Sequence, residues 1–334
     1  ANVTTVKRII TGNVFQNVPA VFVSSELDEE HIITDIYGYR NGTFENLTTV
    51  AAMLAGTDLT YGHFQMSAYP ASQPQLMHLL RNGSVEKLLA SGAKTAAPGL
   101  LPGSVLARFE GSPAEHPLFK EGCFHVEGQA SQLAALCVEA KPGDTVIDLC
   151  AAPGGKTLLL AEEMQGQGAL YSCDVAEHRV GLIRSAVERM GFAHVTALCN
   201  DATRPNPKLP AADRILVDAP CSGLGILAKK PDIRYKTLEK ARHDELLTTQ
   251  SSILDTAAAL LKAGGRLVYS TCTIDPAENE EQVAAFLARH PEFRVVRPAV
   301  AFPDGMTVGE HGALSVPTRT GMDGFFLCAM QKTQ

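Results

Sequence analysis

Two cysteines follow strand-like apolar runs and have the chemistry of nucleophiles. In "VDAPCSGLG" (217–225), the apolar run ends at Asp218, and Cys221 follows after Ala-Pro. In "LVYSTCT" (267–273), a second apolar run leads to Cys272. A thiolate can bond covalently to an electrophilic substrate atom and so split a difficult reaction into easier steps. Taken singly, such a cysteine is more often a buried structural residue, but two of them, one after Asp-Ala-Pro, indicate an active site.

The second half of the chain alternates strand-like runs with segments of helical spacing. Apolar and β-branched runs predict strands at 145–150, 168–174, 195–201, 214–220, 266–273, 293–300 and 324–332. Helical spacing is found between several of them, at 157–164, 176–191, 238–262 and 277–291. This alternation predicts an α/β fold with a doubly wound, mostly parallel seven-stranded sheet.

Four aspartates lie at or near the carboxyl ends of the predicted strands: Asp148, Asp174, Asp201 and Asp218. Doubly wound sheets bind their ligands at that edge. One such aspartate is more often a helix cap or a turn residue. Four at one edge, together with the two cysteines, predict a ligand-binding site.

Length and composition are ordinary for a soluble globular protein: 334 residues, 45% hydrophobic and 19% charged. No apolar run reaches the ~18 residues of a membrane span, and the start of the chain lacks a basic-then-apolar signal sequence. We therefore expect a cytoplasmic monomer without membrane contact. Eight cysteines without a Cys-x-x-Cys pair predict reduced thiols and no metal site.

The charge of the chain is unevenly distributed. Its net value of -7 argues mildly against a nucleic-acid-binding protein. However, "LAKKPDIRYK" (227–236) and "EKARH" (239–243) form a basic stretch. Its cations, Lys229 and Lys230 among them, could contact phosphates. From composition alone, a solvated loop is an equally good interpretation.

The residues before the predicted sheet fall into two parts. Residues 70–135 combine a short helical segment with flanking strand-like runs and predict a small α+β module. Residues 1–69 contain short β-like runs but no motif, so no role follows for them. We therefore expect three domains, at 1–69, 70–135 and 136–334, of which the last carries the active site.

The stretch "DLCAAPGGKT" (148–157) joins the first strand of the predicted sheet to a helix through a glycine-containing turn. Such a turn lets a ligand approach the backbone and the N–H groups of the helix start. It lacks the dinucleotide fingerprint, and Cys150 stands where a Walker A loop has its first glycine. The turn resembles the first-strand loop of class I S-adenosylmethionine methyltransferases. Asp174 would then bind the ribose hydroxyls and Asp201 the adenine amine.

Four motifs together resemble one family: "DLCAAPGGKT", "CDVAEHRV", "VDAPCSGLG" and "YSTCT". That family is the Sun-type RNA cytosine-C5 methyltransferases, and the nearest resemblance is to bacterial members acting on 16S ribosomal RNA. The run "HPLFKEGCFHVEGQASQLAAL" (116–136) is similar to the family's segment before the catalytic domain. The resemblance covers about residues 112–334. It implies S-adenosylmethionine as cofactor and RNA, in particular 16S rRNA, as partner.

The resemblance also implies covalent catalysis. Cytosine C5 is a poor nucleophile until a thiolate adds to C6; C5 then takes the methyl group, a base removes the C5 proton and the thiolate leaves. The attacking cysteine corresponds to Cys272, while Cys221 assists release of the finished base. Asp218 would hold the N3/N4 edge of the cytosine, and Lys156 would lie near the reacting base. The implied cofactor-binding residues are Cys150, Ala151, Ala152, Pro153, Gly154, Gly155, Lys156, Asp174, Arg179, Asp201 and Asp218.

The chain departs from the family pattern before its catalytic domain. Residues 1–69 lack the helical pattern of the bacterial N-terminal domain. The Arg-x-Asn-Thr strand that usually begins the RNA-binding module is reduced to "LLRNGS" (79–84). Glu127-Gly128-Gln129 stands where the family usually has Gln-Asp-Glu. These departures concern the choice of RNA and not the chemistry.

The cysteines and the basic stretch are compatible with two other functions. A DNA cytosine-C5 methyltransferase would use the Pro-Cys cysteine, Cys221, as its nucleophile. The second cysteine and the lack of room for a target-recognition region argue against it. A non-catalytic, RNA-binding ribosome assembly factor is disfavoured because every motif residue is present.

Overall fold

The chain divides by its internal contacts into two compact units, Ala1–Gln73 with Ala228–Pro231, and Pro74–Leu227 with Asp232–Gln334. A computed structural model describes residues 20–24, 35–40, 43–46, 75–79, 85–101, 103–109, 112–230, 232–233 and 240–333. In the first unit, β1 (Ala20–Ser24), β2 (Asp35–Arg40) and β3 (Thr43–Asn46) form an antiparallel sheet. The expected division into three domains stays a prediction.

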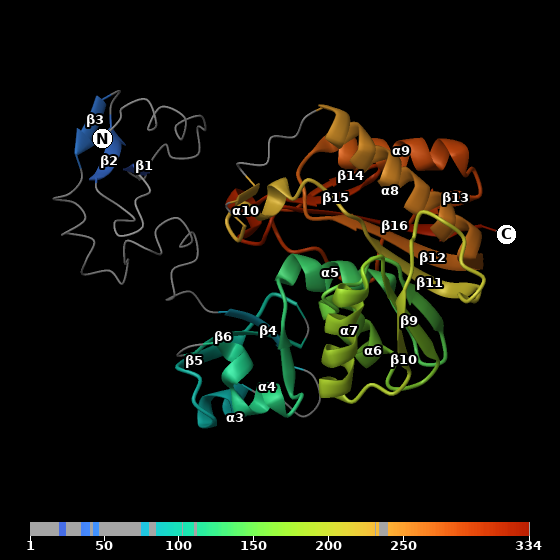
Figure 1. Cartoon of the computed structure of the whole chain (residues 1–334), viewed down its shortest axis with the longest axis horizontal. Helices are drawn as coiled ribbons and strands as arrows, with labels where there is room; N and C mark the ends of the chain where they lie inside the picture. Colours follow the sequence, from blue (N-terminus) through green and yellow to red (C-terminus); the bar gives the residue numbers. More distant parts are fainter. Residues whose placement is uncertain are drawn as a thin grey trace. The chain divides into compact units, whose positions relative to one another are not determined.

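The larger unit is built on one nine-stranded sheet (Figure 1). Its order is β10-β9-β8-β11-β12-β16-β15-β14, and β13 pairs with β16. The pairings from β10 to β12 are parallel, and those that involve β13 to β16 are antiparallel. The strands are β8 (Thr145–Asp148), β9 (Ala169–Asp174), β10 (Val195–Cys199), β11 (Ala212–Asp218), β12 (Leu261–Thr271), β13 (Phe293–Val295), β14 (Thr307–Gly309), β15 (Gly312–Ser315) and β16 (Phe325–Lys332).

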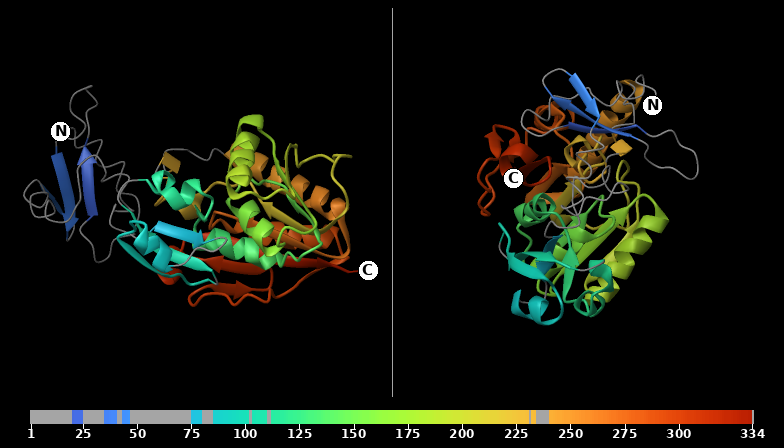
Figure 2. Two further views of the ribbon diagram at one scale, coloured as in Figure 1. Left: turned by 90° about the horizontal axis from the view of Figure 1, so that it is seen from below. Right: turned by 90° about the vertical axis from the view of Figure 1, so that its left-hand side faces the viewer.

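The predicted α/β fold class is confirmed, but the sheet has nine strands in place of the expected seven. All seven predicted runs form strands. The additional pair, β14 and β15, is a short antiparallel hairpin whose first strand is exposed throughout. Such a strand needs no apolar alternation, so its sequence carries little signal. Figure 2 shows the red C-terminal strands continuing the sheet.

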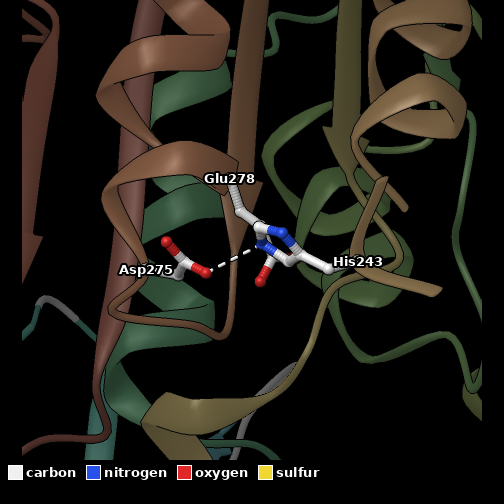
Figure 3. Close-up of side chains that lie close together, drawn as sticks. All are labelled: His243, Asp275 and Glu278. Carbon is white, nitrogen blue, oxygen red and sulfur yellow. Dashed lines mark hydrogen bonds and ion pairs between the residues drawn. The ribbon is translucent and has the colours of Figure 1, made fainter. Parts of the chain in front are cut away.

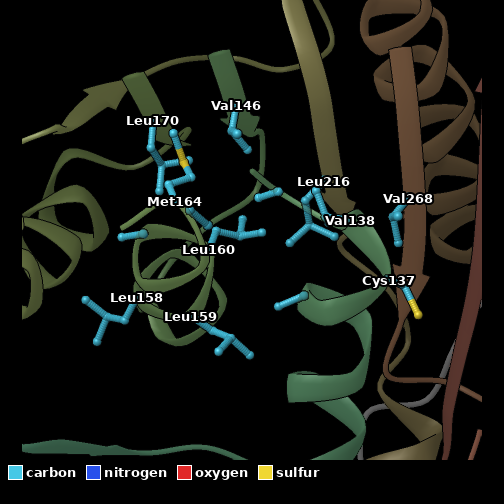
Figure 4. Packing of buried hydrophobic residues seen from close by; sticks show 14 of the residues in the cluster. Cys137, Val138, Val146, Leu158, Leu159, Leu160, Met164, Leu170, Leu216 and Val268 are labelled. Carbon is cyan, nitrogen blue, oxygen red and sulfur yellow. The ribbon is translucent and has the colours of Figure 1, made fainter. Parts of the chain in front are cut away.

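Helices cover both faces of the sheet, as a doubly wound fold requires. On one face, α5 (Gln129–Val138), α6 (Gly155–Glu163) and α7 (Glu177–Met190) pack against the sheet. The apolar side chains of α6 meet those of the strands in Figure 4. On the other face lie α8 (Lys240–Leu260) and α9 (Glu280–Arg289). Within the described residues, no helix is long and apolar enough to cross a membrane.

A small antiparallel sheet of order β5-β6-β4-β7 precedes the large one in the chain. Arg189 of α7 joins the two, because its guanidinium donates to the carbonyls of Phe119 (2.7 Å) and Phe124 (3.0 Å). Gly122 approaches Arg189 so closely that a Cβ would lie 2.2 Å from the Arg189 carbonyl oxygen. The elements are β4 (Gln75–Leu79), α3 (Val85–Ala90), β5 (Thr95–Pro98), β6 (Ser104–Arg108), η2 (Pro113–Glu115), α4 (Pro117–Lys120) and β7 (Phe124–Val126).

Asp148 ends β8 inside the protein, with no exposed surface. The Thr157 hydroxyl donates to its Oδ2 at 2.8 Å and also lies 2.6 Å from the Ser172 hydroxyl. Within the described structure, Oδ1 has no hydrogen-bond partner. Burial raises the pKa of Asp148 to about 7, because Thr157 and the charge of Lys156 only partly offset the loss of water. The ionised form of Asp148 therefore destabilises the fold.

We predict that Asp148→Asn changes how stability depends on pH. In the wild type, Asp148 is ionised in both the folded and the unfolded chain well above pH 7, so its burial cost is fully present there. Asp148 has its ordinary pKa in the unfolded chain and a higher pKa in the folded protein. Between these two values the folded state holds the proton more tightly, so the burial cost shrinks as the pH falls from 8 to 5. The variant lacks this contribution of about 2–3 kcal/mol. Urea unfolding of both proteins at pH 5 and pH 8 measures it; an identical pH dependence would contradict the prediction.

Candidate active site

Cys221 and Cys272 lie beside each other at the carboxyl edge of the sheet. β11 and β12 are adjacent and parallel, with Asp218 in register with Ser270. The chain leaves both strands at the same edge, so the loops that follow them meet. The two sulfur atoms are 3.2 Å apart, both residues are partly buried, and neither cysteine is in a disulfide. The structure thus brings together the two cysteines that the sequence singled out.

The backbone around Cys221 is held by two buried side chains. Gln250 of α8 donates to the Pro220 carbonyl at 3.0 Å and to Glu278 Oε2 at 2.8 Å. The same Glu278 oxygen accepts from the Ser222 backbone N–H at 2.9 Å. Both neighbours of Cys221 are therefore fixed, and the rotamer of the thiol is the main freedom left.

The residue after Glu278 holds the other cysteine in the same way. The Thr271 hydroxyl donates to Asn279 Oδ1, and Asn279 Nδ2 donates to the Thr273 carbonyl at 3.1 Å. Thr271 and Thr273 flank Cys272, so both of its neighbours are also fixed. The two cysteine segments are joined directly by a 2.7 Å contact between the hydroxyls of Ser222 and Thr273. Glu278 and Asn279, which are consecutive and fully buried, thus fix the backbone on either side of both thiols.

The surroundings of Cys221 keep its thiol protonated. Its pKa lies well above the ordinary value because of its hydrogen bond with Cys272, its burial and the nearby carboxylates of Asp218 and Glu278. A protonated Cys221 can donate its S–H to Cys272. A negative charge on Cys272 would be stabilised by that bond.

Asp218 and Lys156 form an ion pair next to the cysteines. The ammonium of Lys156 donates to Asp218 Oδ2 at 2.7 Å, and the Ser270 hydroxyl donates to Oδ1 at 2.8 Å. The pKa of Lys156 lies above its ordinary value, because the carboxylates of Asp218, Glu127 and Asp148 outweigh the effect of burial. Lys156 Nζ also lies 5.5 Å from the centre of the Phe325 ring. Cys272 packs against the small apolar cluster that contains Phe325.

The loop between β8 and α6 presents its backbone at the same edge. Gly154 has φ +111°, a conformation that strains any residue with a side chain. No side chain caps α6, so the side chains leave the first N–H groups of this helix available to a ligand. Cys150 lies among carboxylates, and burial together with Asp148, Asp218 and Asp174 raises its thiol pKa well above the ordinary value.

Glu127, in the segment before α5, lies against Gly155, where the loop between β8 and α6 enters the helix. A Cβ on Gly155 would lie 3.0 Å from Glu127 Oε1. The carboxylate is buried, 2.9 Å from His125 Nε2, and accepts from the Ser131 hydroxyl at 2.7 Å. Although burial acts in the opposite direction, His125, Lys156 and Ser131 together lower the pKa of Glu127. This chain therefore places a negative charge where the family usually has Gln.

Asp174 and Arg179 lie next to the loop. Asp174 Oδ1 accepts from the Ala176 N–H at 3.1 Å, and Oδ2 lies 3.2 Å from the Arg179 guanidinium. Arg179 also donates to the Ala152 carbonyl at 3.0 Å and so ties the loop to the end of β9. The Asp174 side chain is only 3% exposed. A ligand that reaches its carboxylate must share Oδ2 with Arg179.

Asp201 follows β10 and is the most exposed of the four aspartates. Its Oδ1 accepts from the backbone and hydroxyl of Thr203, which lowers its pKa. Beside it, Asn200 is buried, and its Nδ2 has no hydrogen-bond partner in the described structure. An amide donor and a carboxylate acceptor thus stand together at the end of β10.

Sequence reasoning missed the residues that position the site. Ser270, Gln250, Glu278 and Asn279 act by contacts across the fold, and none has a local pattern that marks it. Glu127 had one signal, its departure from the family pattern. The remaining predicted residues, Ala151 and Pro153 among them, belong to the loop between β8 and α6.

Comparison with known proteins finds relatives that are named ribosomal RNA methyltransferases. The probable ribosomal RNA small subunit methyltransferase B of Bacillus subtilis (strain 168) is 37% identical over 264 residues, which is 74% of this chain and 56% of that protein. The chain thus spans about half the length of the curated relatives it matches.

Two solved structures are similar in fold and sequence. The crystal structure of PH0851 has a TM-score of 0.71 and 32% identity, covering 77% of this chain and 59% of that one. NSun6 from Pyrococcus horikoshii, solved with SFG, has a TM-score of 0.61 and 29% identity, covering 68% and 57%. A family model described as 16S rRNA methyltransferase RsmB/F matches residues 135–331. The chain therefore belongs to the RsmB/F family of 16S rRNA methyltransferases, as its four motifs predicted.

Proposed function

We propose that this chain carries the catalytic part of an S-adenosylmethionine-dependent cytosine-C5 methyltransferase of small-subunit ribosomal RNA. The observation that carries the proposal is the 3.2 Å contact between the sulfurs of Cys221 and Cys272. Methylation at C5 through a C6 adduct needs a nucleophile and a second group that moves protons. Two thiols fixed at one edge of the sheet, beside an acidic and a basic side chain, supply both.

Cys272 is proposed as the nucleophile. Because the environment of Cys221 keeps that thiol protonated, its S–H can donate to Cys272 and favour a thiolate there. The Cys272 thiolate adds to C6 of a cytosine that has left its stack, and C5 becomes nucleophilic. S-adenosylmethionine, when bound, supplies the electrophilic methyl group. Cys221, once its own proton has passed to solvent, then accepts the C5 proton, and the electrons of the C5–H bond re-form the C5=C6 bond as the Cys272 sulfur leaves.

Asp218 and Lys156 are proposed to hold the target base. Asp218 has one oxygen fixed by Ser270 and the other by Lys156, and each oxygen keeps a further lone pair for a base amino group. Charge builds up on the cytosine ring as the thiolate adds to C6. The ammonium of Lys156, held 2.7 Å from Asp218, is placed to stabilise it.

The residues at the neighbouring strand ends fit S-adenosylmethionine. The open start of α6 and the small residues before it suit a ligand that lies against the backbone. Asp174 is proposed to accept from the ribose hydroxyls, and Asp201 from the adenine amine. The unpartnered Nδ2 of Asn200 supports a polar ligand at this point. NSun6 from Pyrococcus horikoshii, 29% identical, was solved with SFG, which also supports a ligand in this fold.

The choice of 16S rRNA as substrate is supported by the description of the family model and by relatives that are named ribosomal RNA small subunit methyltransferases. RNA contacts through the basic stretch 227–243 stay a sequence-based prediction, because residues 231 and 234–239 lie outside the described part of the chain. A cytoplasmic monomer is likewise proposed from the sequence.

The cofactor assignment predicts a specific loss of affinity. Asp174→Asn keeps the size of the side chain but removes the charge that binds the ribose, so S-adenosylmethionine should bind at least ten-fold more weakly, about 1.4 kcal/mol. Calorimetry with the exposed Asp304→Asn as a control measures this. Equal affinity in all three proteins, or binding of NAD in place of S-adenosylmethionine, would refute the assignment.

The cysteine roles predict opposite phenotypes for two single variants. Cys272→Ala should neither methylate 16S rRNA nor form a covalent adduct with it. Cys221→Ala should attack and methylate but stall before release, so an adduct should survive a denaturing gel. The double variant should show no adduct, and Cys123→Ala, in the small module, should behave as the wild type.

The reverse pattern, with adduct in Cys272→Ala and none in Cys221→Ala, would give Cys221 the nucleophilic role of DNA cytosine-C5 methyltransferases. Running the assay on DNA as well as RNA tests that alternative directly. Full activity of both single variants would remove the cysteines from the mechanism. No methylation of any RNA or DNA by the wild type would favour a non-catalytic assembly factor.

A further inference from the structure

A cluster of possible metal ligands lies behind the Cys221 loop, outside the proposed catalytic groups. His243 is in the first turn of α8, Asp275 caps the start of η5 (Pro276–Glu278), and Glu278 is the last residue of η5. One ligand atom from each lies within 4.8 Å of the others. In Figure 3 the three side chains converge from these two elements, and a dashed line joins His243 to Asp275.

Glu278 has an oxygen that its surroundings leave unused. Its Oε2 accepts from the Ser222 N–H and from Gln250. Its Oε1 is buried, and no described atom hydrogen-bonds to it. Within the described residues no lysine or arginine forms a salt bridge with this fully buried side chain. A buried carboxylate oxygen without a donor is costly unless a cation completes it.

We propose that His243, Asp275 and Glu278 bind a divalent transition-metal ion, with Zn²⁺ as the best fit. Imidazole nitrogen and carboxylate oxygen are both ligand types that Zn²⁺ accepts, and water would fill the remaining position. His243 Nε2 is hydrogen-bonded to Asp275 Oδ2 at 2.9 Å. An ion would replace this bond and move the two atoms slightly apart, because ligands at about 2.0–2.1 Å in a tetrahedron are about 3.3 Å apart. The lack of a Cys-x-x-Cys pair argues only against a thiolate site.

The contacts around the cluster orient its ligands. Ser222 and Gln250 fix Oε2 of Glu278, and the Ala277 N–H donates to Asp275 Oδ1 at 3.0 Å, leaving Oδ2 facing His243. Such outer contacts are typical of metal sites. The side chains of His243 and Asp275 are each 24% exposed, so an ion can enter from solvent. Bound there, it would join α8 to η5 and stiffen the backbone that carries Cys221.

Titration of Zn²⁺ into the chelator-treated full chain, followed by calorimetry, tests the site. We expect one high-affinity ion per chain and a rise in melting temperature on binding. His243→Ala and Asp275→Asn should each weaken binding at least ten-fold. Asp275→Asn keeps the oxygen that caps η5, and His311→Ala, in the turn between β14 and β15, is a matched control that should bind normally.

Zinc X-ray absorption distinguishes this site from the cysteine pair. Only nitrogen and oxygen neighbours near 2.0 Å are expected, whereas sulfur at about 2.3 Å would assign the ion to Cys221 and Cys272 and overturn the proposal. Unchanged affinity in His243→Ala, or no binding to the wild type, would also overturn it. Melting curves in chelator show whether the variants fold as the wild type does. The proposed methyltransferase function does not depend on this result.

Discussion

The contact between the sulfur atoms of Cys221 and Cys272 is the constraint on which the rest of the site depends. The sheet brings the two loops to one edge by making β11 and β12 neighbours in parallel. This strand pairing alone does not fix the positions of the residues beside the two thiols. Glu278 and Asn279 hold residues on either side of each thiol by hydrogen bonds, so that suitable rotamers place the two sulfurs 3.2 Å apart. Glu278 and Asn279 thus hold in place two loops that are distant in sequence.

The charges of the site explain why the second thiol matters. Lys156 faces the carboxylates of Asp218, Glu127 and Asp148, so its charge is shared among them. A cation that is shared in this way stabilises charge on a base held by Asp218, but it adds little positive field at the Cys272 sulfur. Burial, Asp148 and Asp218 raise the pKa of the Cys150 thiol, and Asp218 also helps to keep Cys221 protonated. A hydrogen bond from Cys221 is therefore the more direct source of stabilisation for a thiolate on Cys272.

Much of this arrangement could be predicted from sequence, because it depends on local patterns. Alternating strands and helices identified the doubly wound sheet, and the strand ends located the acids and both cysteines. The β14–β15 hairpin was missed because it is short and has an exposed first strand. Ser270, Glu278 and Asn279 were missed because their roles are defined by partners across the fold. In the sequence, Glu127 stood out only as a departure from the family pattern. Its contact with Gly155 at the start of α6 depends on the fold and could not be predicted from that pattern.

The pH at which each cysteine becomes reactive tests the central claim most directly. Alkylation rates of Cys221 and Cys272 with iodoacetamide, followed by peptide mass spectrometry from pH 5 to pH 10, report each thiolate separately. The account predicts that Cys272 reacts at a lower pH than Cys221. It also predicts that Cys221→Ala, which removes the S–H donor, moves the reactivity of Cys272 to higher pH. If Cys221 reacts first, or if Cys272 is unaffected by Cys221→Ala, the contact does not activate Cys272 and the account is wrong.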